Sequence, residues 1–151
     1  MFQHLISTAP TWTQLPLRIA LGLVFIAHGA QKVFGVWGGS GLAAFTSRQA
    51  PLGLRPAWLW LGAAAFAEFV GGALVLIGLL TRLGALSVAC VMLVAMFGVH
   101  WGEFFLPKGI EYTVALLGMA LALVIAGGGR LSADEVLMSS AHGGRRRYAT
   151  R

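Results

Sequence analysis

Ionisable side chains lie inside apolar stretches of this chain. A charge in such a setting costs free energy unless it is paired or has a function. Glu68 lies in a run of alanine, glycine, valine and phenylalanine. His28 and Lys32 lie near the end of the first apolar run of the chain, residues 15–34, and Arg18 lies near its start. Carboxylate, imidazole and ammonium groups that meet in such a setting can pair, carry protons or bind a polar ligand.

Helical spacing places these cations on one face. At about 100° per residue, Arg18, His28 and Lys32 fall within an arc of about 80°, and Phe25 lies close to the same stripe. We expect this stripe to face protein, because lipid would not accept it. Further candidates follow the third apolar run and open the fourth: His100, Trp101, Glu103 and Glu111. We expect these residues to converge in the half of a membrane helix bundle nearer its outer, periplasmic surface. Glu68, at mid-depth, would lie at the bottom of that cluster.

Each candidate also has a structural interpretation. Lys32 can extend to the headgroups, and Arg18 can anchor the cytoplasmic end of its helix. Glu111 can interact favourably with the helix dipole at the N-terminus of the fourth helix. His100 and Glu103 can be interfacial residues. A buried pair with Lys32 or His28 is the minimal way to satisfy Glu68. A salt-bridge network and a ligand site therefore both stay open.

The motifs narrow the chemistry. The chain has no P-loop, no HExxH and no nucleophile elbow, and its one cysteine, Cys90, cannot form an internal pair. We expect no metal. A quinone headgroup suits the donors and acceptors: Lys32 and His100 would hold its oxygens, while Glu68 and His28 would handle protons. Six aromatic residues could supply stacking surface: Phe25, Trp37, Phe66, Phe69, Phe97 and Trp101.

The composition indicates a lipid environment. Of 151 residues, 58% are hydrophobic and 11% charged, which is too little charge to cover a soluble domain. The net charge of +6 could suggest nucleic acid, but several basic residues sit at the ends of apolar runs. We therefore expect a lipid bilayer as partner and no nucleic acid.

Four apolar runs are long enough to predict an all-α, transmembrane four-helix bundle. They cover residues 15–34, 57–80, 83–99 and 110–126. We divide the chain into an N-terminal segment (1–14), a membrane domain (15–127) and a cytoplasmic short helix with a basic tail (128–151). A short interfacial helix is expected around residues 41–45. Ser132 and Glu135 have capping-box spacing, which predicts a short helix ending near Met138.

Charge bias predicts the orientation. Four spans put both termini on one side, and that side collects seven of the eleven basic residues, which favours the cytoplasm. Thr81 and Arg82 are expected to form most of the short link between the second and third spans. The arginine-rich tail is expected to lie on anionic headgroups. Glycine and alanine in the second span suit close helix contacts within the bundle or in a homo-oligomer.

The sequence resembles the DoxX family of small four-helix membrane proteins. The stretches that carry the resemblance cover residues 17–22, 28–35, 67–72, 76–82, 92–100, 111–112 and 127–134. The resemblance implies a bacterial inner-membrane protein linked to quinones, working with other subunits of a membrane oxidoreductase system. The matching positions to carry over are Arg18, His28, Lys32, Glu68 and His100.

Two functions follow as hypotheses. The first is a quinone- or quinol-interacting redox component, which would make the chain a subunit of a quinone-dependent oxidoreductase. The second is a non-catalytic scaffold that anchors a soluble oxidoreductase, with the buried charges fixing only helix register. A conduit for protons or small solutes is less favoured, because the ionisable residues cluster toward one side.

Overall fold

The chain is built from helices. The computed structural model describes residues 6–9, 11–105 and 109–148, with side-chain surroundings up to residue 140, and these parts contain no strand. The α-helices are α2 (Gln14–Phe34), α3 (Gly41–Thr46), α4 (Ala57–Ile77), α5 (Thr81–Gly98), α6 (Glu111–Ala126) and α7 (Ala133–Tyr148). This confirms the all-α prediction. Lys108, which entered the charge count, lies outside the described residues.

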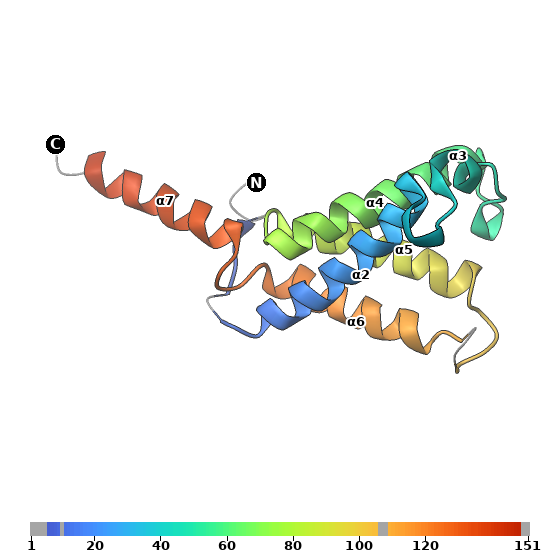
Figure 1. Cartoon of the computed structure of the whole chain (residues 1–151). Coiled ribbons are helices and arrows are strands. Elements are labelled where there is room, and N and C mark those ends of the chain that lie inside the picture. Colours follow the sequence, from blue (N-terminus) through green and yellow to red (C-terminus); the bar gives the residue numbers. More distant parts are fainter. Residues whose placement is uncertain (1–5, 10, 106–108, 149–151) are drawn as a thin grey trace.

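The four long helices α2, α4, α5 and α6 lie side by side (Figure 1). α2 packs most extensively on α4, α4 continues onto α5, and α5 onto α6, while α2 also touches α6. α3 covers one end of the α2–α4 pair, and α7 extends away from the opposite end (Figure 1). The apolar core is drawn from all four long helices: Leu21, Phe25, Val75, Ala85, Val88, Ala89, Met92, Leu116, Ala120 and Leu123.

Length and hydropathy mark the membrane-crossing helices. Among the described residues, α2, α4 and α5 are each long and apolar enough to cross a membrane. α6 is apolar but has 16 residues, which gives about 24 Å against a hydrocarbon core of about 30 Å. Exposed tryptophans stand at both ends of the bundle, as in interfacial aromatic belts: Trp37, Trp58, Trp60 and Trp101 at the α3 end, and Trp12 at the other.

The second apolar helix ends earlier than predicted. α4 stops at Ile77, and residues 78–80 form the link, so Thr81 begins α5 instead of belonging to the connection. Gly78 ends α4 because it adopts a left-handed conformation (φ 75°) and its N–H donates to the carbonyl of Leu74. The carboxylate of Asp134 then accepts from the N–H groups of Leu80 (2.7 Å) and Thr81 (2.9 Å). A side chain from beyond α6 therefore caps α5.

α7 starts at the predicted cap but is longer than expected. Ser132 Oγ accepts the N–H of Glu135 at 3.1 Å, and Glu135 Oε2 accepts the N–H of Leu131 at 3.1 Å. The helix continues to Tyr148, so the prediction of a short helix ending near Met138 is wrong. A hydrogen-bonded first turn lowers the free-energy cost of starting the helix.

Glycines let α2 and α4 approach closely. A Cβ atom on Gly29 would lie 2.5 Å from the backbone nitrogen of Phe69. We expect Gly29→Ala to force the helices apart and to lower the free energy of unfolding by about 1–3 kcal/mol. Thermal unfolding in detergent, followed by helical circular dichroism, measures this.

The matched control is Gly118→Ala on α6, where an added Cβ meets nothing within 4 Å. We expect it to leave stability unchanged or to raise it by up to about 1 kcal/mol, because alanine is the better helix former. Equal unfolding midpoints for the two variants would contradict the close α2–α4 contact.

Candidate functional site

An ion pair joins the two most closely packed helices. The ammonium of Lys32, in the last turn of α2, donates to both carboxylate oxygens of Glu68 on α4. The Glu68 side chain is 4% exposed and that of Lys32 27%. The predicted buried pair between the first two apolar helices is confirmed, with Lys32 as the partner. Glu68 is therefore enclosed, while Lys32 retains an outward opening.

One aromatic ring contacts this pair. The Lys32 Nζ atom lies 5.5 Å from the ring centroid of Phe45 on α3, close enough for a cation–π contact. The rings of Phe34 and Phe69, on α2 and α4, meet edge to face at 5.2 Å. Through Phe45, α3 therefore contributes to the surroundings of the ion pair.

His28 lies one helical turn before Lys32 on α2 and within electrostatic range of both Lys32 and Glu68. Its side chain is exposed, so the prediction that it faces protein is wrong. The reason is helix rotation: Gly29 makes the contact with α4, and His28 is turned about 100° from it. Six residues separate His28 from the end of α2, which places it about 9 Å inside the helix end.

Arg18 belongs to the opposite end of the bundle. Its guanidinium is buried and donates to four backbone carbonyls: Val75 (3.0 Å), Leu76 (2.8 Å), Gly128 (3.1 Å) and Leu131 (3.2 Å). Along α2, Arg18 is about 21 Å from Lys32. The structure therefore separates Arg18 from the other candidates and gives it the end of α4 and the loop after α6.

Asp134, which was not among the residues predicted to form a site, completes this end. Its carboxylate is buried, accepts the hydroxyl of Thr81 at 2.8 Å, and lies within electrostatic range of Arg18. Arg82 adds bonds to the carbonyls of Ser7 (3.1 Å) and Val124 (2.9 Å). In the sequence, Asp134 stands within the cap motif and at the end of the resemblance stretch 127–134, but neither feature predicts the bond to α5.

The remaining candidates lie where α5 ends and α6 begins. Trp101 packs against Phe97 at 5.0 Å, and with Glu103 it lines a small hollow of about 320 Å³. His100 follows α5, and Glu111 is the first residue of α6. The Lys32–Glu68 pair instead joins α2 and α4. Phe25 is 1% exposed within the apolar core, so it offers no stacking surface to a ligand.

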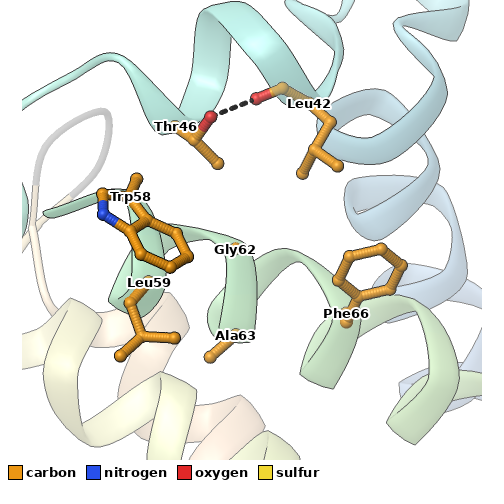
Figure 2. A pocket seen from close by; sticks show the side chains of 7 residues that line it. All are labelled: Leu42, Thr46, Trp58, Leu59, Gly62, Ala63 and Phe66. Carbon is orange, nitrogen blue, oxygen red and sulfur yellow. Dashed lines mark hydrogen bonds between the residues drawn. The ribbon is translucent and has the colours of Figure 1, made fainter. Parts of the chain in front are cut away.

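A larger apolar groove of about 420 Å³ lies between α3 and α4 (Figure 2). Its lining residues are Leu42, Thr46, Trp58, Leu59, Gly62, Ala63 and Phe66. Phe66 is rotated about 200° from Glu68 on α4, so the groove and the ion pair occupy different faces of that helix. Of the residues predicted from the sequence to form a site, Phe66 alone lines this groove.

These features define a multi-pass helical membrane protein with an ion pair between two of its apolar helices. The sequence profile of the DoxX family matches residues 13–101, which is more than half of the chain. The chain belongs to the DoxX family. No curated protein and no solved structure matches it. The family match includes Arg18, His28, Lys32, Glu68 and His100, whereas Glu103, Glu111 and Asp134 lie beyond it.

Proposed function

We propose that this chain binds the headgroup of a quinone or quinol beside the Lys32–Glu68 pair, as a redox component of a membrane oxidoreductase system. The observation that carries the proposal is His28: an imidazole exposed on a membrane-crossing helix, one turn from a buried ion pair. An ion pair that served only to hold α2 on α4 would not need a titratable neighbour facing outward.

The proposal includes a membrane topology. We place α6 as a fourth span, shorter than the others and accommodated by local thinning of the bilayer. With four spans both termini lie on one side, which the basic bias assigns to the cytoplasm of a bacterial inner membrane. The end that carries α3 then faces the periplasm, and His28 lies about 9 Å below that interface.

The residues present fit such a headgroup. An ammonium has three N–H donors, and the two carboxylate oxygens of Glu68 take two, which leaves one for a carbonyl oxygen. The imidazole of His28 can donate to a carbonyl or accept from a hydroxyl, and it can hold a proton near the membrane surface. A bound quinone would supply two-electron, two-proton redox chemistry, and these side chains would bind it and exchange its protons.

Direct titration tests the site. The protein, purified in detergent, is titrated with a short-chain quinone, and tryptophan fluorescence quenching reports binding. His28→Ala removes one hydrogen bond to the ligand, so we expect the Kd to rise about tenfold. His4→Ala, in the N-terminal segment, is the matched control and should bind as the unmodified protein does. Two results would contradict the proposal: tryptophan fluorescence of the unmodified protein that the quinone does not quench, or equal Kd values for His28→Ala and the control.

The second candidate is a scaffold for a soluble oxidoreductase. The observation that favours it is α7, which extends away from the bundle (Figure 1) and exposes Val136 and Leu137 near its start. In this hypothesis the basic end of the chain and α7 meet the partner, and the Lys32–Glu68 pair only fixes how α2 sits on α4. A second copy of the chain could join through the glycine- and alanine-rich faces.

A further inference from the structure

The groove between α3 and α4 is shaped by small residues below and large ones at its ends. Gly62 forms its floor: a Cβ added there would meet only Thr46 Cγ2, at 3.9 Å. Trp58 and Phe66 stand at the two ends of the groove, and Leu42 and Thr46 hang over it from α3 (Figure 2). The groove therefore runs along α4 for about 12 Å, from near the start of the helix toward its middle.

The lining suits a hydrocarbon chain. Thr46 carries the one hydroxyl among the lining residues, and it donates to the carbonyl of Leu42 at 2.9 Å. The other side chains are aliphatic or aromatic, apart from the indole nitrogen of Trp58 at the outer end. A polar headgroup would find no hydrogen-bond partner inside the groove, whereas an acyl chain has no polar group and would lose no hydrogen bond by entering it.

Two arginines lie close in the chain to residues that line this groove. Arg48 is two residues past Thr46, and Arg55 is three residues before Trp58. Both are exposed, and residues 33–67 contain no aspartate or glutamate. The guanidinium of Arg48 also packs on the ring of Phe45 at 5.7 Å, which restrains it near α3. This part of the molecule is thus locally cationic beside a hydrocarbon-shaped groove.

We infer that the α3–α4 groove is a binding site for one anionic phospholipid. One acyl chain lies along α4 over Gly62, and the phosphate lies at the headgroup level near Arg48 and Arg55. Guanidinium groups bind phosphate oxygens through paired N–H donors, which gives the site a preference for anionic over zwitterionic headgroups. The acyl-chain groove is distinct from the proposed quinone site, because it uses the other face of α4, while Arg48 and Lys32 both contact the ring of Phe45.

Native mass spectrometry of the full-length protein in detergent tests the inference. The probes are phosphatidylglycerol and phosphatidylcholine with the same acyl chains. We expect one phosphatidylglycerol to bind in preference to phosphatidylcholine. The double variant Arg48→Gln/Arg55→Gln should weaken phosphatidylglycerol binding about thirtyfold and leave phosphatidylcholine binding unchanged. Arg145→Gln/Arg146→Gln removes the same charge from the C-terminal tail, which is expected to lie on anionic headgroups without a groove, so it should weaken phosphatidylglycerol binding clearly less than the Arg48/Arg55 pair does.

Filling the groove separates it from a general surface effect. Gly62→Leu should weaken the binding of both lipids, while Gly118→Leu, on the open face of α6, should not. Should Gly62→Leu fail to fold, Phe66→Ala removes the inner wall, and the same loss is expected. Equal binding of the two lipids, unchanged binding to the groove variant that folds, or an equal loss in both arginine pairs would overturn the inference.

Discussion

Lys32→Met is expected to lower the free energy of unfolding by about 3–5 kcal/mol, because it leaves a carboxylate without a partner inside the helix interface. Glu68 is 4% exposed and cannot reach water or headgroups. Glu68→Leu, which removes the other partner of the ion pair, should lower the free energy of unfolding clearly less. Lys32 is 27% exposed in the last turn of α2, where its long side chain can extend outward and the helix dipole favours a cation.

The double variant Lys32→Met/Glu68→Leu completes the cycle. It removes both charges and replaces them with apolar side chains, so we expect stability close to that of the unmodified protein. Thermal unfolding of all four proteins in the same detergent measures the coupling between the two sites. Losses that are equal for the two single variants and simply add in the double variant would show that the pair does not stabilise the fold.

The same double variant separates the two proposed functions. It should be folded, and it retains His28, but it lacks the ammonium and carboxylate that the quinone site requires. A folded double variant whose tryptophan fluorescence is no longer quenched by a short-chain quinone supports the ligand site. A folded double variant with an unchanged quinone Kd would leave the pair only its role in helix packing.

Arg18→Met is the second variant with a large expected effect, a loss of about 3–5 kcal/mol in the free energy of unfolding. The substitution removes the guanidinium donor from four carbonyls, of which that of Val75 keeps the N–H of Gly78 (3.2 Å), and it removes the cation within electrostatic range of buried Asp134. Arg18→Lys should restore only part of the loss, because an ammonium lacks the planar fork that reaches α4 and the loop after α6 together.

Arg48→Met is the control for this prediction, since Arg48 is exposed and its substitution should change stability by about 0.5 kcal/mol or less. Thermal unfolding in detergent measures all three variants. If the Arg18→Met protein can be handled at low temperature, its quinone Kd should be unchanged, because Arg18 lies about 21 Å along α2 from Lys32. Stability equal to that of Arg48→Met would refute the assigned role.

The sequence alone determined the features that short-range physics or composition enforces. Apolar runs predicted the helices, with α2 and α6 matching within about one residue, because lipid-exposed backbone must be helical. The Ser132–Glu135 cap followed from local hydrogen bonding. A partner for Glu68 on α2 was predictable too, since a lone carboxylate between apolar helices is too costly to leave unpaired.

The tertiary structure decided how each helix is rotated and what lies across from it. The close contact at Gly29 turns Lys32 toward Glu68 and leaves His28 exposed, a distinction that the 80° arc on α2 could not make. Arg18 found carbonyls from α4 and from the loop after α6, and Asp134 crossed from α7 to cap α5. These contacts join residues 36 or more positions apart, so they depend on how whole helices pack, which helical periodicity within a single segment does not contain.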